Sequence, residues 1–257
     1  MDYPVAVHLE TWTKCNAACN FCPYPTLVRK GNKMSDELIE KILTDLEDIP
    51  KSQPFYFSPF KVNEPFLDKR LLPLLEDVNR RMPNAIFRLF SNGTPITEKK
   101  IDQLAKLRNV AHLWISLNDY RPKEYEEVMQ LPLEKTLKRL DLLHKKKLEG
   151  FPHNVIVSRV CDNTFTDGRF CVWVHERYPA FTVRLIKRES WLDFYEHDAI
   201  AKEVPASTCS RWNEIDITST GLVSLCCMDG RAQYPIGDVS KQHVLEVFNS
   251  PSYRRMR

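Results

Sequence analysis

The pattern that most restricts the fold is an alternation of strand-like and helix-like segments through the first 187 residues. Short β-branched and aromatic runs alternate with longer segments whose apolar residues recur at helical spacing. The strand patterns cover residues 5–11, 55–60, 85–90, 110–117, 154–160 and 181–186, and the helical patterns cover residues 35–49, 67–82, 97–107, 132–149 and 170–178. This alternation predicts an α/β protein with a parallel sheet and right-handed crossovers. Because there are six units rather than eight, we expect an open, partial (β/α)6 barrel with ligands at the carboxyl ends of its strands.

The pattern changes after residue 187. Two further strand patterns and a short helical end follow, at residues 213–218, 222–227 and 244–257. The Thr220-Gly221 pair between the two strand patterns predicts a β-hairpin. We therefore expect two domains, a partial barrel over residues 1–187 and a small hairpin-plus-helix domain over residues 188–257.

Composition and charge exclude several classes of protein. The chain has 257 residues, of which 43% are hydrophobic and 28% charged, as expected for a globular protein with a sizeable core. Its net charge of +3 comes from scattered basic clusters, so we do not expect nucleic acid as a partner. No apolar run approaches the roughly 20 residues that span a bilayer, and the N-terminus lacks a basic-then-apolar leader. We expect no membrane association and a cytoplasmic location.

Three of the eight cysteines, Cys15, Cys19 and Cys22, directly follow the first strand pattern. At this cysteine content, the expected number of chance occurrences of that spacing in the chain is only about 0.007. Three thiolates on a short loop can bind three irons of an iron–sulfur cube and leave the fourth iron open to another ligand. Structural zinc is the alternative, but it requires a fourth protein ligand, and the nearest candidate, His8, lies within a strand pattern.

The Cys15-x3-Cys19-x2-Cys22 run, with aromatic Phe21 before its last cysteine, resembles the signature of the radical S-adenosylmethionine (SAM) superfamily. That resemblance implies a 4Fe–4S cluster whose open iron binds the amino and carboxylate groups of SAM. It also implies reductive cleavage of SAM to a 5'-deoxyadenosyl radical that abstracts hydrogen from a substrate. A reductase such as flavodoxin or ferredoxin is the implied electron donor.

The resemblance extends through the barrel and implies further SAM-binding residues. Asn63-Glu64-Pro65 stands where the family has Gly-Glu-Pro, with Glu64 as the partner of the SAM amino group. Asparagine in place of the family's glycine at position 63 is compatible with the turn, because asparagine tolerates a positive φ better than most non-glycine residues. The other implied SAM-binding residues are Phe21, Ser91, Asn92, Ser116 and Arg159, the last as a carboxylate clamp.

A second cysteine group begins at Cys209, which is followed by Gly221 and Cys226 at a spacing that resembles SPASM and twitch domains. That resemblance implies Cys209 and Cys226 as ligands of an auxiliary iron–sulfur cluster. Adjacent strand residues point to opposite faces, so at most one of Cys226 and Cys227 easily serves one cluster, and Cys226 fits the spacing. No cysteine follows Cys227. Either a C-terminal tail is missing, or the auxiliary cluster is absent or completed by other groups.

The resemblance to twitch-type 2-deoxy-scyllo-inosamine dehydrogenases implies an oxidoreductase acting on a small polar metabolite, a carbohydrate or an aminocyclitol. Oxidation and epimerisation both stay open, because they differ only in what quenches the substrate radical. A ribosomal-peptide maturase of the SPASM type is the alternative. A non-catalytic iron–sulfur or zinc protein is the alternative from another class.

Overall fold

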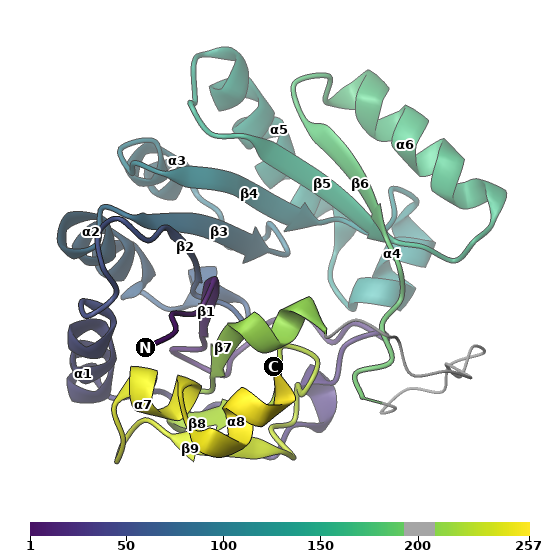
Figure 1. The fold of residues 1–257 in the computed structure, drawn as a ribbon. Helices are drawn as coiled ribbons and strands as arrows, with labels where there is room; N and C mark the ends of the chain where they lie inside the picture. The colour runs from purple at the N-terminus through teal and green to yellow at the C-terminus, as the bar shows by residue number, and fades with distance from the viewer. Residues whose placement is uncertain (193–208) are drawn as a thin grey trace.

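The computed structural model describes residues 1–192 and 209–257 (Figure 1). Its described strands form one sheet in the order β6-β5-β4-β3-β2-β1-β7-β8-β9. The barrel strands, all parallel, are β1 (Ala6–Leu9), β2 (Phe55–Ser58), β3 (Ala85–Ser91), β4 (Val110–Ser116), β5 (Val155–Val160) and β6 (Thr182–Ile186). The two edge strands, β6 and β9, do not pair with each other, so the sheet stays open. The predicted partial barrel is confirmed.

The outer face of the barrel strands is covered by α1 (Asp36–Leu46), α2 (Leu71–Arg81), α3 (Glu98–Leu104), α5 (Leu133–Leu148) and α6 (Phe165–Arg177) (Figure 1). Helix α4 (Pro122–Met129) lies instead beyond the carboxyl ends of the strands, where its Met129 carbonyl accepts from the Ala18 amide at 3.3 Å. The sequence pattern missed α4, a short helix in the connection between β4 and α5. Helix α6 begins five residues before its predicted start, because the Thr164 side chain caps it by accepting from the Thr166 amide. None of the helices in the described ranges combines the length and the hydropathy that a bilayer span requires.

The strands bury one face against these helices and leave the other face inside the half-barrel. Along β3, Phe87 and Leu89 are buried, whereas the alternating Arg88 and Phe90 are only partly covered. A closed barrel fills its interior with such side chains. Because this barrel is open, its interior face instead forms the wall of a cavity.

The C-terminal segment extends the barrel sheet rather than forming a separate layer. Strand β7 (Glu214–Ile217) pairs parallel with β1, and β8 (Leu222–Ser224) pairs antiparallel with β7, which confirms the predicted hairpin. The elements that follow are β9 (Pro235–Asp238), α7 (Val244–Phe248) and α8 (Pro251–Met256), and of these β9 was not predicted. The boundary at residue 187 stays a prediction, and part of the segment beyond it, residues 193–208, lies outside the described residues.

Gly237 marks the closest approach between β9 and α7. A Cβ atom at this position would lie 2.4 Å from Cγ1 of Val247, which is fully buried. We expect Gly237→Ala to lower the free energy of unfolding by about 1–3 kcal/mol, because the methyl group pushes β9 away from α7. Urea denaturation measures this change. Gly168→Ala on α6 is the matched control: its Cβ would meet nothing within 4 Å, so its stability should be unchanged or higher by up to about 1 kcal/mol.

Candidate functional site

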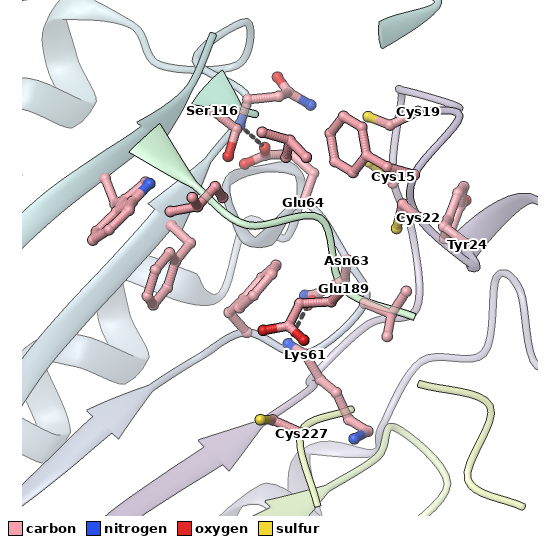
Figure 2. A pocket seen from close by; sticks show the side chains of 18 of the residues that line it. Cys15, Cys19, Cys22, Tyr24, Lys61, Asn63, Glu64, Ser116, Glu189 and Cys227 are labelled. Carbon is pink, nitrogen blue, oxygen red and sulfur yellow. Dashed lines mark hydrogen bonds between the residues drawn. The ribbon is translucent and has the colours of Figure 1, made fainter. Parts of the chain in front are cut away.

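The carboxyl ends of the barrel strands open into a cavity of about 600 Å³, a size typical of small-molecule sites. Of the residues predicted from sequence, those that line it are Cys15, Cys19, Phe21, Cys22, Asn63, Glu64, Ser91, Asn92 and Ser116. Figure 2 shows the cysteines on one wall, Glu64 and Ser116 on another, and Lys61 with Cys227 at the opposite end. Pro65, Arg159, Cys209 and Cys226, although described, do not line it.

The cysteine loop holds its three thiols in a largely dry environment. The Cys22 amide donates to the Cys19 carbonyl at 3.1 Å, and the Ala17 amide donates to the Cys15 sulfur at 3.4 Å. Burial raises the pKa of Cys15 to about 12 and that of Cys22 to about 11, so without metal these groups are neutral thiols. Metal binding there must therefore release protons.

The spacing of the three thiols suits a cluster better than a single ion. Within residues 1–192 and 209–257, no three histidine, cysteine or acidic side chains come together tightly enough to hold one metal ion. In an iron–sulfur cube each thiolate binds a different iron, so the sulfurs must stand apart around a shared space. Three cysteines lining one cavity wall fit that group.

Glu64 is the most constrained polar group in the cavity. Its Oε1 accepts from the Phe66 amide and the Ser91 hydroxyl at 3.1 and 3.0 Å, and its Oε2 accepts from the Asn92 amide at 2.6 Å. A carboxylate has about four lone-pair sites, so the described residues leave one on Oε2 for a ligand. Burial is the largest influence and raises the pKa of Glu64 to about 7 despite these donors. A cation bound there would keep the carboxylate charged.

The turn after β3 fixes the donors to Glu64. Gly93 has φ of 83°, a conformation that favours glycine, and this turn brings the Ser91 hydroxyl and the Asn92 amide to the same carboxylate. The Asn92 side chain donates to Asn16 at 2.8 Å. The Ser-Asn-Gly turn therefore connects the Glu64 site to the cysteine loop.

Asn63 lines the cavity and has an unpaired buried donor. Its Oδ1 accepts from the Lys61 amide at 3.0 Å, but its buried Nδ2 has no partner among the described residues. An unpaired buried amide donor is costly, and a bound acceptor would remove that cost. Asn63 does not have a positive φ. The turn therefore does not need the left-handed conformation that the family's glycine at this position suggested.

Arg159 lies outside the cavity in a buried network of carboxylates. Its guanidinium is 2.8 Å from both Asp119 and Asp167 and also pairs with Asp162. It donates in addition to the Asn118 carbonyl, so four of the donors on its planar group already have partners. The structure does not bring Arg159 to the place where a carboxylate clamp would be needed. Pro65, for its part, begins a buried 3-10 turn beneath Glu64.

The end of the cavity opposite Glu64 is lined by charged groups that the sequence patterns did not single out. Lys61 is fully buried, and its Nζ donates to the Cys226 carbonyl at 3.1 Å and lies 4.0 Å from Oδ1 of Asp216. His8 Nε2 lies 3.4 Å from Oε2 of Glu214. His8, Lys61 and Glu214 are among the residues that line the cavity, so this end of it is polar. Tyr24, Lys187 and Trp191 also line the cavity.

The second cysteine group is dispersed. Cys209 is exposed before the 3-10 turn Ser210–Asn213, Cys226 is buried, and Cys227 faces the cavity with its sulfur 3.4 Å from Nη1 of Arg211. Within the described residues these thiols do not form a group of three that could hold a single metal ion. The assignment of Cys209 and Cys226 as ligands of an auxiliary cluster stays a prediction.

Comparison with known proteins agrees with this geometry. Residues 9–168 match the radical SAM superfamily, and residues 209–257 match the SPASM iron–sulfur cluster-binding domain. A curated relative from Pyrococcus furiosus, a tungsten-containing aldehyde ferredoxin oxidoreductase cofactor-modifying protein, is 28% identical over 101 residues. That match spans 39% of this chain and only 27% of the relative.

Two solved structures share the fold over the whole chain. The structure of BtrN in complex with AdoMet and 2-DOIA has a TM-score of 0.65 at 16% identity, and the match covers 87% of BtrN. Streptococcus suis SuiB bound to its precursor peptide SuiA has a TM-score of 0.77 at 13% identity, and the match covers 67% of SuiB. One of these neighbours was solved with a small molecule and the other with a peptide.

Proposed function

The chain belongs to the radical SAM superfamily, and from that premise we propose that it reductively cleaves SAM in order to abstract hydrogen from a small polar metabolite. One observation carries the proposal: three cysteines and the buried Glu64 carboxylate line one cavity at the carboxyl ends of the barrel strands. When bound, the cluster and SAM together supply an electron and a hydrogen-abstracting radical. The protein has to hold them, exclude water and position the substrate.

The residues of the cavity divide this work. Cys15, Cys19 and Cys22 hold the cluster. Glu64, with a lone pair free on Oε2, accepts from the SAM amino group, and the unpaired Nδ2 of Asn63 donates to an acceptor on the same ligand. Phe21 supplies an apolar surface beside the cysteines for the adenine ring.

The substrate is proposed to occupy the end of the cavity near Lys61. His8, Lys61 and Glu214 offer hydrogen bonds of both polarities there, which suits a hydroxylated or aminated compound such as a carbohydrate or an aminocyclitol. The fold shared with BtrN, solved with AdoMet and 2-DOIA, supports this class. Oxidation or epimerisation at a carbon bearing a hydroxyl group is the proposed outcome.

A peptide is the second candidate substrate. An aromatic wall of Phe60, Phe90 and Trp114 lines the cavity, with ring centroids 5.0 Å apart for the first pair and 5.8 Å for the second. Such a wall accepts an apolar peptide side chain as readily as a sugar face. The shared fold with SuiB, solved with its precursor peptide, supports this alternative.

Anaerobic reconstitution with iron and sulfide, followed by reduction in the presence of SAM, tests the proposal. Formation of 5'-deoxyadenosine supports a radical SAM enzyme. Bound metal without SAM cleavage supports the third possibility, a non-catalytic iron–sulfur or zinc protein. Deuterium transfer into 5'-deoxyadenosine from labelled aminocyclitols, sugars or peptides then identifies the substrate class.

The affinity for SAM should depend on pH through Glu64. The carboxyl of Glu64, with its pKa at about 7, is charged above that pH and neutral below it. The charged form accepts more strongly than the neutral form from the N–H groups of the SAM amine, so lowering the pH from 7.5 to 6 should weaken binding by up to about eightfold. Isothermal titration of SAM into the reconstituted protein measures the change.

Glu64→Gln is the matched control for this pH dependence. The amide keeps the size of the side chain but carries no charge, so binding should be weak at both pH values and nearly independent of pH. A wild-type dissociation constant that does not change between pH 7.5 and 6 contradicts the assigned role of Glu64.

A further inference from the structure

The segment that carries the three cysteines is strongly basic. Residues 11–35 contain Lys14, Arg29, Lys30 and Lys33 and no aspartate or glutamate. The net charge of the whole chain is only +3, so this segment holds more surplus positive charge than the chain does. A local concentration of one sign of charge beside a functional loop steers a partner of the opposite sign.

Three of these four cations are exposed, and two of them lie over one tryptophan ring. The Lys14 and Lys33 ammonium groups lie 4.5 and 5.5 Å from the centre of the Trp12 ring. Lys30 is also exposed, and its Nζ donates only to the Pro25 carbonyl, at 2.8 Å. Among the described residues none of these three lysines pairs with a carboxylate, whereas Arg29 is bound to the buried Glu10 at 2.9 Å. We call Trp12, Lys14, Lys30, Lys33 and the fully exposed Val28 the Trp12 patch.

The backbone holds this patch in place. The Thr13 amide donates to the Asn32 carbonyl at 2.8 Å, and the Gly31 amide donates to the Thr13 carbonyl at 2.7 Å. Trp12 and Lys33 form an isolated β-bridge. The patch is therefore fixed before a partner arrives, which reduces the entropy lost on docking.

The patch adjoins the cysteine loop and lies outside the cavity. Lys14 immediately precedes Cys15, and its carbonyl accepts from the Glu64 amide at 2.8 Å. The three thiols line the cavity, whereas none of the residues of the Trp12 patch does. A protein that docks on the patch thus approaches the cluster site and leaves the cavity free for SAM and substrate.

We propose that the Trp12 patch is the docking surface for an acidic electron-transfer protein of the flavodoxin or ferredoxin class, which delivers electrons to the cluster. The inference rests on the proposed function. In each encounter the reduced partner loses one electron and the cluster gains it, with no proton or bond exchanged. The central aromatic and apolar side chains supply the contact, and the lysines around them supply orientation. Three lysines are fewer than the four to eight that typify lipid-binding basic clusters, so a membrane surface is a poorer match.

Binding measurements on the reconstituted protein test the docking surface. Lys14→Glu combined with Lys33→Glu should weaken binding of purified flavodoxin at least tenfold at 50 mM salt and flatten its salt dependence. A parallel titration with a ferredoxin shows which donor class fits better. Lys30→Glu combined with Lys33→Glu gives a second variant in which no substitution adjoins a cysteine. Lys51→Glu combined with Lys145→Glu is the matched control, since both lysines are exposed and remote from the cysteine loop in sequence; it should change the affinity less than twofold.

Comparing electron donors separates this inference from the proposed function. With dithionite as a small reductant, the patch variants should form 5'-deoxyadenosine at the wild-type rate. With flavodoxin as donor, their rate of 5'-deoxyadenosine formation should be at least tenfold lower than that of the wild type. If wild-type protein fails with dithionite, the proposed function is wrong, and the binding data still test the surface. Equal affinity of the patch variants and wild type for both donors, or tighter binding to anionic vesicles than to either protein, overturns the docking proposal.

Discussion

Replacing Cys15, Cys19 or Cys22 with alanine is expected to abolish 5'-deoxyadenosine formation and to lower the iron content by one cluster per chain. Each thiolate binds one iron, and residues 11–35, which carry the three cysteines, contain no fourth cysteine, no histidine and no acidic residue to replace a lost ligand. We expect a cluster held by only two thiolates to be lost on reduction. Formation of 5'-deoxyadenosine should then fall to the level of a sample without protein. Iron analysis, absorbance near 400 nm and chromatography of the SAM products measure it.

Cys171→Ala is the control for these substitutions. Cys171 lies on α6, is partly exposed and does not line the cavity, so its loss should leave both the iron content and SAM cleavage unchanged. If any of the three loop variants keeps its full iron content and forms 5'-deoxyadenosine, the cluster assignment fails. If the Cys171 variant loses iron equally, the effect reflects general misfolding.

The periodic elements of the fold were predictable because their signals are local. Strands such as β3 and β5 and helices such as α1 and α5 repeat apolar residues at a spacing that their own backbone sets. The pairing of β1 with β7 joins residues about 208 positions apart, as in the match of His8 with Asp216. No local pattern encodes such a contact, so the sequence could not show that the sheet continues from β1 into β7.

The site was predictable where residues come in motifs and unpredictable where they come singly. The three cysteines and the Asn63-Glu64-Pro65 run each have a spacing that can be recognised. Lys61 and Cys227 reach the cavity only because β2 and β8 end beside it, and a lone lysine or a second cysteine carries no such signal. Arg159 is the reverse case. Its position at a strand end suggested that it binds the SAM carboxylate, whereas in the structure carboxylates from a loop and a helix surround it.

Replacing Arg159 with methionine is expected to destabilise the protein by about 3 kcal/mol without a comparable loss of SAM affinity. The substitution leaves Asp167 without its 2.8 Å partner in a site where both side chains are about nine-tenths buried, and it also frees the Asn118 carbonyl. Breaking a buried pair by removing one partner costs about 3–5 kcal/mol. The lower end applies here because Asp119 keeps a second arginine, Arg121, at 2.8 Å. Urea denaturation gives the stability, and calorimetry in the folded range gives the dissociation constant of SAM.

Arg121→Met is the matched control, since Arg121 contacts the same Asp119 carboxylate from a much more exposed position, with 39% of its side chain accessible. An exposed pair contributes about 0.2–1 kcal/mol, so this variant should be several times less destabilised. Should Arg159→Met fail to fold, Arg159→Lys keeps the charge while losing the planar geometry and supplies the SAM measurement. A tenfold weaker affinity for SAM at unchanged stability in either Arg159 variant would restore the carboxylate-clamp role. Lost stability at unchanged affinity establishes that Arg159 holds the β5–α6 connection in place rather than binding SAM.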